Sequence, residues 1–382
     1  MNVLIIGMLD SVHLARWLKQ FEGQQINFFI LSSRKYRKIH VELKSLLLSR
    51  SSAKYQLISI FAQNFLSGYY DYLKYEVFNR MFFSLSRSNN LKKIIENYRF
   101  DYIHTMELQN AGYLLVNLPS SLLSNTKVIV TNWGSDIFHY HKFSNHLELI
   151  KKVLAIADFY SAECIRDYSL AKKYGFSGQE LPCIPNAGGF NLWSTKTNFV
   201  LPSERNQIII KGYGGIFGRA DLPISLLKVI LKNYPNLQIF IYSVTKDTYK
   251  LIKNLPRQLQ SNIRISTVRK PLTHSQLISE FTRSRIYIGC SESDGISTSF
   301  LEALTTGAYP IQTDTSCASE WQMLGAVASI IKLDSEELYK VILTALNDNL
   351  LVDNAANKNY DFSLKYLDYG IIQQQAFDFY KV

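Results

Sequence analysis

Short apolar runs alternate with longer amphipathic segments along most of the chain. The runs are rich in β-branched residues, which is typical of strands that are buried on both faces of a sheet. Between them, apolar residues recur at helical spacing, as in Leu14, Trp17, Leu18 and Phe21. The strands expected from this pattern are Asn2–Gly7, Ile26–Leu31, Phe100–Met106, Lys127–Thr131, Tyr160–Cys164, Ile208–Lys211, Gln238–Ser243, Ile263–Ser266, Ile286–Ile288 and Ala308–Thr313. The alternation predicts an α/β protein with parallel sheets.

The strands fall into two sets, separated by a segment of turn-forming residues. This segment, Leu181–Asn198, contains Pro182, Pro185, Gly188 and Gly189, which suit a hinge between domains. A chain of 382 residues is also longer than one average domain. We therefore expect one α/β domain over residues 1–190 and a second over 191–360. The pattern predicts a C-terminal helix within residues 361–382, starting near Leu364.

The composition narrows the range of partners. The chain carries 42 Lys and Arg against 31 Asp and Glu, a formal net charge of +11, which favours anionic partners. No zinc-finger or RNA-binding motif accompanies this charge, so no nucleic-acid partner is expected. The four cysteines are far apart, which predicts free thiols in a reducing compartment. There is neither a signal peptide nor an apolar run near the ~18 residues that span a bilayer, so we expect a cytoplasmic protein.

One segment of the first half, Lys35–Lys93, is both basic and aromatic. Such residues on amphipathic helices suit a membrane interface, which suggests a peripheral contact with anionic lipid at the inner face of the cytoplasmic membrane. The alternative, which we favour for most of these aromatic residues, is that the helices pack on the sheet and the aromatics are core.

A strand–loop–helix–strand unit, Ser284–Asp314, has the features of an anion site. Ser297, Thr298 and Ser299 lie where its helix begins, so their backbone amides lack partners within the helix and point outward with the positive end of its dipole. Two carboxylates, Asp294 and Glu302, flank these residues. The alternative is an ordinary capping box, because Ser299 and Glu302 form an S-x-x-E pattern.

A glycine-rich turn follows the first strand of the second half. Gly212, Gly214, Gly215, Gly218 and Arg219 lie close together, so the backbone can approach a phosphate and the arginine can bind it through two hydrogen bonds. Lys211 precedes the turn. The spacing matches neither a dinucleotide-binding fingerprint nor a P-loop.

Polar residues also follow the predicted strands of the first half. His13 and Arg16 come after the first strand, Glu107 after Phe100–Met106, and Trp133 and Asp136 after Lys127–Thr131. Carboxyl ends of strands are where open α/β sheets bind ligands. An ordinary surface position is the competing interpretation for His13 and Arg16. No metal site is predicted, since His139, His141 and His146 have no recognisable partner ligands.

Together these motifs resemble the GT-B glycosyltransferases of glycosyltransferase family 4, over essentially the whole chain. Asp294 and Glu302 match the E-x7-E element of that family, and Gly214–Arg219 matches its glycine-plus-GR loop. Ile184–Phe190 (IPNAGGF) is similar to the interdomain IPNG element, and Trp133–Asp136 to an N-terminal HG-x-D element.

This resemblance implies a fold and a reaction. The fold would be two Rossmann-like doubly wound domains facing across a cleft, with a C-terminal helix crossing back to the first domain. The reaction would be retaining transfer of a sugar from a UDP- or GDP-sugar, without a metal, to a growing surface glycan or a polyprenyl-diphosphate-linked acceptor, as in polysaccharide, lipopolysaccharide or capsule biosynthesis.

The resemblance also assigns roles to residues. Glu302 would bind the ribose, Asp294 would lie near the donor sugar, and Arg219 and the loop amides would hold the diphosphate. Catalysis is assigned to Asp294, Glu302, Arg219 and Asp136, donor binding to Gly214, Gly215, Gly218, Lys211, Ser297, Thr298 and Ser299, and the acceptor side to His13, Arg16, Glu107 and Trp133.

Three positions depart from the family pattern. Asp294 replaces the usual first Glu, Trp133 stands where many members have His, and Ile224 lies near the place of a usual basic residue. We hypothesise that Lys211 supplies the missing charge. These departures keep two alternatives open, a GT-B nucleotide-sugar 2-epimerase and a non-catalytic scaffold with the same fold.

Overall fold

The computed structural model describes residues 1–36, 38–49, 51–58, 87–192 and 199–381. The chain divides into two compact units. The first comprises Met1–Gly188 together with Ile372–Val382, and the second comprises Gly189–Ile371. The division after Gly188 lies within the Pro- and Gly-containing segment.

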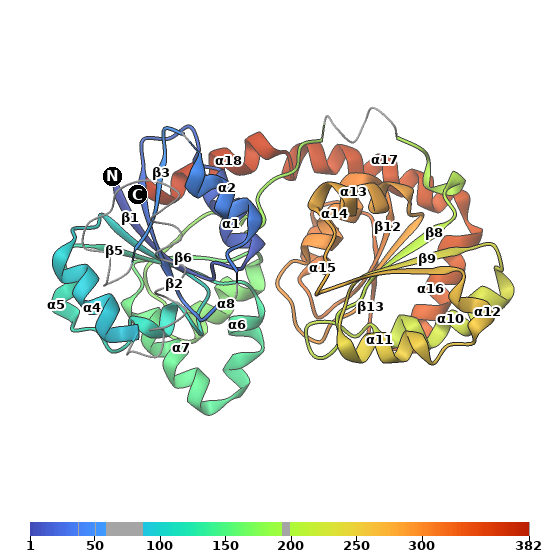
Figure 1. The fold of residues 1–382 in the computed structure, drawn as a ribbon, viewed down its shortest axis with the longest axis horizontal. Coiled ribbons are helices and arrows are strands. Elements are labelled where there is room, and N and C mark those ends of the chain that lie inside the picture. The colour runs from blue at the N-terminus through green and yellow to red at the C-terminus, as the bar shows by residue number, and fades with distance from the viewer. Residues whose placement is uncertain (37, 50, 59–86, 193–198, 382) are drawn as a thin grey trace. The chain divides into compact units, whose positions relative to one another are not determined.

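The first unit is built on a parallel sheet with the strand order β3-β2-β1-β4-β5-β6-β7 (Figure 1). Its strands are β1 (Asn2–Gly7), β2 (Asn27–Ser32), β3 (Lys54–Leu57), β4 (Tyr102–Met106), β5 (Lys127–Thr131), β6 (Phe159–Ser161) and β7 (Gln179–Glu180). The strand expected at Tyr160–Cys164 lies slightly earlier, at Phe159–Ser161, and it pairs with β7, a strand that was not expected.

Alternate side chains of each strand enter different cores. Val3 and Ile5 of β1 pack into one cluster, and Leu4 and Ile6 pack into the other. One face of the sheet is covered by α1 (Val12–Lys19) and α2 (Val41–Leu48), whose apolar sides join the first cluster. The other face carries α4 (Arg87–Asn97), α7 (Ser144–Ile156) and α8 (Ile165–Lys173). Short helical turns α5 (Ser120–Leu123) and α6 (Ser135–Phe138) complete the loops, with 3-10 turns at Gly112–Leu114 and Tyr140–Lys142.

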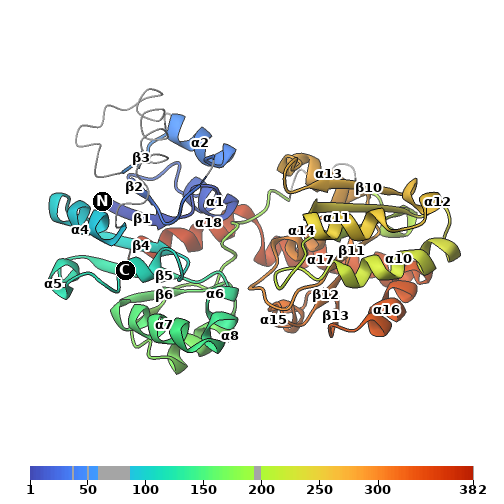
Figure 2. The same cartoon turned by 60° about the horizontal axis from the view of Figure 1, so that its bottom comes forward.

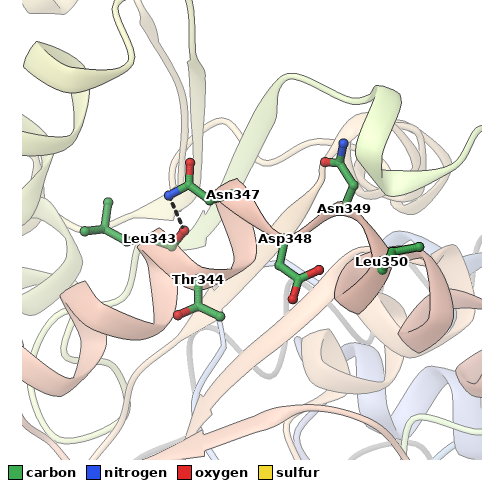
Figure 3. Close-up of a pocket in the computed structure, with 6 residues that line it drawn as sticks. All are labelled: Leu343, Thr344, Asn347, Asp348, Asn349 and Leu350. Atoms are coloured by element: carbon green, nitrogen blue, oxygen red, sulfur yellow. Dashed lines mark hydrogen bonds between the residues drawn. The ribbon is translucent and has the colours of Figure 1, made fainter.

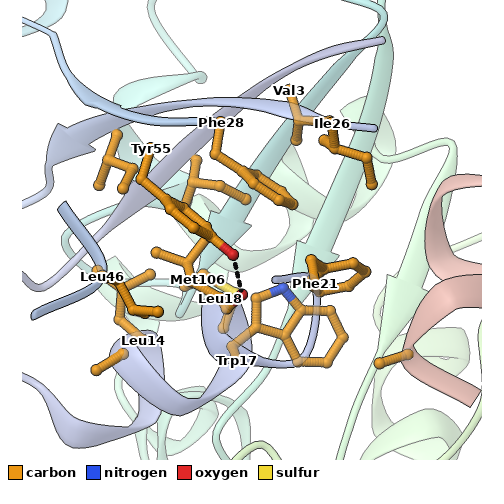
Figure 4. Close-up of a cluster of buried hydrophobic side chains, with 14 of the residues drawn as sticks. Val3, Leu14, Trp17, Leu18, Phe21, Ile26, Phe28, Leu46, Tyr55 and Met106 are labelled. Atoms are coloured by element: carbon orange, nitrogen blue, oxygen red, sulfur yellow. Dashed lines mark hydrogen bonds between the residues drawn. The ribbon is translucent and has the colours of Figure 1, made fainter. Parts of the chain in front are cut away.

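The end of the chain contributes to the first of these cores. Phe379 and Tyr380 are buried beside Trp17, which also packs among the residues shown in Figure 4. The ring centroids of Trp17 and Phe379 are 4.6 Å apart. In the same core the Tyr55 hydroxyl donates to the Leu18 carbonyl at 3.0 Å.

The second unit has a parallel sheet with the order β10-β9-β8-β11-β12-β13, shown from a second direction in Figure 2. Its strands are β8 (Gln207–Lys211), β9 (Gln238–Val244), β10 (Ile263–Thr267), β11 (Ile286–Gly289), β12 (Tyr309–Thr313) and β13 (Ser329–Ile331). Its helices are α10 (Asp221–Asn233), α11 (Lys246–Lys253), α12 (Arg257–Gln260), α13 (His274–Arg283), α14 (Thr298–Thr306), α15 (Ala318–Met323), α16 (Ser335–Asn347) and α17 (Asn349–Tyr366), with a 3-10 turn at Pro202–Glu204. The prediction of two doubly wound parallel sheets is confirmed.

The C-terminal region differs from the single helix expected from Leu364 onward. Helix α17 ends at Tyr366 and α18 (Tyr369–Phe377) begins anew, followed by a 3-10 turn at Asp378–Tyr380. The break has a physical cause, since the backbone here pairs with Phe190. The Phe190 amide donates to the Leu367 carbonyl at 2.8 Å, and the Tyr369 amide donates to the Phe190 carbonyl at 3.0 Å. This pairing takes the place of helical hydrogen bonds at Leu367 and Tyr369.

The proposed membrane contact of Lys35–Lys93 falls largely on residues 59–86, which lie outside the described ranges. Within those ranges, every helix is too short or too polar to cross a bilayer.

Candidate functional site

In each unit the strand order reverses between the first strand and its neighbour on the other side. In the second unit this point lies between β8 and β11, and in the first between β1 and β4. Doubly wound sheets bind ligands at the carboxyl ends of strands at such a point. The glycine-rich turn follows β8, and the loop with Asp294 follows β11, so two of the predicted motifs lie at this point of the second unit.

Backbone hydrogen bonds join these two loops. The Arg219 amide donates to the Cys290 carbonyl at 2.8 Å, and the Glu292 amide donates to the Ile216 carbonyl at 2.9 Å. The two loops are therefore held together by main-chain contacts, which depend little on side-chain identity.

Glycines of the turn are required by its conformation. Gly215 has φ +79°, a left-handed backbone that favours glycine. A Cβ at Gly218 would lie 2.3 Å from the Tyr213 Cβ and 2.5 Å from its carbonyl oxygen. In the described part of the chain, the amides of Gly214 and Gly215 have no hydrogen-bond partner. The turn thus presents backbone donors, as an anion site requires.

Arg219 lies in this turn, but its guanidinium is engaged by protein carboxylates. It contacts Asp221 at 2.9 Å and Glu292 at 2.8 Å. These hydrogen bonds, first that to Asp221, raise the pKa of Arg219. From the sequence pattern we expected the Arg219 guanidinium to be free to bind a diphosphate. The structure instead places this guanidinium between two carboxylates that the motif did not indicate.

Helix α14 begins at Thr298 after the N-cap Ser297 and ends at Gly307, which has φ +82°. The capping box that was the alternative interpretation of Ser299 and Glu302 is absent. The Ser299 hydroxyl accepts a hydrogen bond from Tyr242 at 2.6 Å, and the Glu302 carboxylate pairs with His274. Among the described residues the amides of Ser297, Thr298 and Ser299 have no acceptor, so the positive end of this helix is open to an anion.

Lys211 and Asp294 form an ion pair beside that helix end. The Lys211 Nζ lies 3.2 Å from Asp294 Oδ2 and 3.5 Å from Ser297 Oγ. Burial lowers the pKa of Lys211, but Asp294, Tyr287 and Tyr213 outweigh it and hold the net pKa above its ordinary value. The amine is therefore charged, and it lies where β8 ends, next to the open amides of α14.

Glu302 lies one turn into α14 with only 3% of its side chain exposed, and its Oε1 is 3.0 Å from His274 Nε2. No sequence motif indicated a role for His274, Tyr242 or Tyr287. A weak signal existed for His274, because Thr273 and Gln276 form the capping box that starts α13 and places His274 at its first position.

In the first unit, Asp136 ties together the loops that follow β4 and β5. Its carboxylate accepts hydrogen bonds from the Leu108 amide at 3.0 Å and the Trp133 amide at 2.8 Å. Burial, and then the charge of Glu107, raise the pKa of Asp136. In the structure, the Asp136 carboxylate therefore binds the backbone of both loops.

Glu107 is similarly engaged in its own loop. It has φ +103°, a rare conformation for a residue other than glycine, and its carboxylate accepts the Asn110 amide at 2.9 Å. Burial raises the pKa of Glu107.

The remaining residues predicted on the acceptor side separate into two groups. The rings of His13 and Trp133 lie together, with centroids 5.2 Å apart. The indole Nε1 of Trp133 is buried and lacks a hydrogen-bond partner in the described chain. Arg16 instead lies 3.6 Å from Glu42 of α2.

Two asparagines to which the sequence motifs assigned no role also lie at this edge of the first sheet. Asn186, in the IPNAGGF segment, donates from Nδ2 to the Asn132 carbonyl at 3.2 Å, and its amide donates to Glu163 at 2.8 Å. The side-chain carbonyl oxygens of Asn132 and Asn186 are buried without a hydrogen-bond partner within the described ranges.

Two surface pockets in the described residues lie away from these loops. One, of about 690 Å³, is formed by Leu343–Leu350 where α16 meets α17 (Figure 3). The other, of about 590 Å³, adjoins Lys127 and Val128 at the start of β5. Both lie toward the amino ends of the strands, opposite to the edge where such sheets bind ligands.

Comparison with solved structures gives full-length matches. HepE from Anabaena, crystallised with UDP and glucose, is 14% identical with a TM-score of 0.68, and the match covers 99% of each chain. Sucrose-phosphate synthase from Thermosynechococcus elongatus is 12% identical with a TM-score of 0.69, covering 100% of this chain and 98% of that one. A variant of S. aureus TarM, crystallised with fondaparinux, alpha-GlcNAc-glycerol and UDP, is 10% identical with a TM-score of 0.68 and complete coverage of both. These likenesses show that the chain has the GT-B fold.

Sequence comparison gives a match to one protein family over part of the chain. Residues 69–166 match the family model described as Glycosyl transferase 4-like. A comparison with curated proteins gave no match. Residues 69–166 are thus similar to a glycosyltransferase 4-like family, and the whole chain has the fold of the GT-B glycosyltransferases.

Proposed function

We propose that this glycosyltransferase moves a sugar from a nucleotide-sugar donor, held by the second unit, to a glycan acceptor with retention of configuration. The observation that carries the proposal is the arrangement at the carboxyl ends of β8 and β11. There the charged Lys211 lies beside the first turn of α14, the helix that carries the open amides and the buried carboxylate of Glu302. The crystallisation of HepE with UDP-glucose supports a UDP-sugar as the donor.

The roles of these residues follow from the negative charge that develops on the leaving group during sugar transfer. Cleavage of the glycosidic bond to a nucleoside diphosphate leaves negative charge on the phosphates, and preorganised donors lower that barrier. Lys211 and the amides of Ser297–Ser299 and Gly214–Gly215 are such donors. Glu302 binds the ribose, and Asp294, which pairs with Lys211, lies toward the donor sugar.

We assign the acceptor to the first unit, at the first turn of α1, which contains His13, and at the loops that contain Glu107 and Trp133. The crystallisation of TarM with a glycan-like ligand supports a carbohydrate acceptor. The net charge of +11 fits an acceptor that is joined to a polyprenyl diphosphate at an anionic membrane, in the synthesis of a surface polysaccharide.

A thermal-shift panel of nucleotide sugars tests the proposal. A ligand that binds only the native state raises the melting temperature, so the true donor stands out. With that donor, release of nucleoside diphosphate should require a carbohydrate acceptor. Acceptor-independent interconversion of the sugar would indicate an epimerase instead, and the absence of any stabilising nucleotide would contradict the proposal.

A further inference from the structure

The Glu302 carboxylate is buried but only half satisfied. One oxygen, Oε1, is 3.0 Å from His274 Nε2. The other, Oε2, has no hydrogen-bond partner in the part of the chain that the structure describes. Oε2 is therefore an acceptor that can take a hydrogen bond from a ligand.

His274 is fixed in place by its own helix. The Thr273 hydroxyl accepts the Gln276 amide at 3.3 Å, while the Gln276 side chain accepts the Thr273 amide at 2.9 Å. This capping box sets the first turn of α13, and the imidazole on that turn reaches across to α14. The side chain of His274 remains 37% exposed, so it lies between the buried carboxylate and the surface.

The chemistry of the pair fixes the direction of the hydrogen bond. A carboxylate only accepts, so His274 donates from Nε2. This bond restricts the rotation of the carboxylate and leaves Oε2 as the acceptor for an incoming hydroxyl. A carboxylate that is already held in one orientation binds a hydroxyl more tightly, because less conformational freedom is lost on binding.

We infer that His274 is a positioning residue, which orients Glu302 so that Oε2 accepts a hydrogen bond from a ribose hydroxyl of the donor. The inference rests on the proposed function and adds to it the residue that lets the site distinguish a ribonucleotide from its deoxy form. A site built to bind a hydroxyl discriminates against an analogue that lacks it, because the protein acceptor is then left unpaired.

Calorimetric titration of the full chain with UDP, GDP and their 2′-deoxy and 3′-deoxy forms tests this inference. We expect the wild type to bind the better ribonucleotide at least ~10-fold more tightly than one of its deoxy forms, equivalent to ~1.4 kcal/mol. In His274→Ala this ratio should fall to about 2 or less. His274→Gln, which places an amide donor near Nε2, should restore much of it, and Ser279→Ala on the exposed side of α13 should leave it unchanged.

The outcomes separate two failures. If His274 only supports the packing of α13, its removal weakens ribo and deoxy forms equally, and an unchanged ratio overturns the inference while the donor site stands. If the wild type binds neither UDP nor GDP, the proposed function fails and the inference fails with it.

Discussion

Lys211 is a charged amine held in a largely buried position, with only 13% of its side chain exposed. Its partner Asp294 lies in the loop that precedes α14, and Ser297 is the N-cap of that helix. The amine therefore stands beside both the first acid of the family element and the open helix end. Arg219 and Lys211 are each paired with carboxylates, but Lys211 also lies beside the first turn of α14, 3.5 Å from Ser297 Oγ.

Replacing Lys211 with alanine should lower kcat/KM for the donor on the order of 100-fold, as removal of a preorganised charge at a leaving group does. Lys211→Arg should recover part of the loss, since it keeps the charge but changes its geometry. Initial rates at varied donor concentration measure this. Lys228→Ala, on the exposed side of α10, is the matched control. Unchanged donor affinity and rate in Lys211→Ala would remove this lysine from the site.

His104 is a buried residue of β4 whose behaviour with pH is predictable. Its ring nitrogens bond to Tyr380 at 2.8 Å and Thr131 at 2.6 Å, and burial lowers the pKa of His104 to about 3. The unfolded chain, in which the pKa is near 6.5, binds a proton that the folded chain excludes. His104 therefore costs nothing above pH 6.5 and destabilises the fold increasingly as the pH falls below that value.

The expected slope from His104 approaches ~1.4 kcal/mol per pH unit between about pH 6 and pH 4. Denaturant unfolding at a series of pH values should show it as a difference between the wild type and His104→Gln, which cannot protonate. Equal pH dependence of the two proteins would mean that the folded state accommodates a charged imidazole.

At the level of elements, most strands and the end of α14 were predictable because they depend on local patterns, whereas the short strands β3, β7 and β13 were not expected. Ile286–Gly289 is apolar on both faces, and Gly307 supplies the left-handed residue that closes a helix. The side-chain partners were not predictable. Ser299 bonds to Tyr242, 57 residues away, and Arg219 to Glu292, 73 residues away. Ser299, which has the spacing of a helix cap, forms a hydrogen bond with a distant residue instead, and no rule of local spacing predicts such partners.

The glycine-rich turn makes a prediction at this scale. Gly218→Ala places a methyl group into the backbone of Tyr213, so the turn must shift and the backbone amides move with it. We expect a loss of about 1–3 kcal/mol in stability and weaker nucleotide binding. Thermal unfolding with and without the donor measures both. Gly23→Ala, where nothing lies within 4 Å of the added carbon, should behave as wild type. A Gly218→Ala protein with wild-type donor binding would show that the conformation of the turn is unimportant.

For the whole molecule, the alternation of apolar runs predicted parallel α/β sheets in both halves of the chain. The resemblance to family 4 rested on motifs at the ends of those runs. The structure of the C-terminal residues could not be predicted from the sequence. A helical pattern predicted one continuous helix from Leu364, but the pairing of Leu367 and Tyr369 with Phe190 interrupts it. Residues from Ile372 onward then belong to the first unit, although the preceding residues belong to the second.

This division makes the last residues part of the stability of the first sheet. Phe379 is fully buried against Trp17 and His104, with ring centroids 4.6 Å and 6.2 Å away. Phe379→Ala removes a buried aromatic ring from a packed core and should cost about 3–5 kcal/mol. Denaturant unfolding, followed by the fluorescence of the tryptophans, measures the loss, and Lys381→Ala at an exposed neighbouring position is the control. If Phe379→Ala unfolds as the wild type does, the end of the chain is a peripheral attachment; a large loss confined to this variant means that the first unit depends on residues that follow the second in the chain.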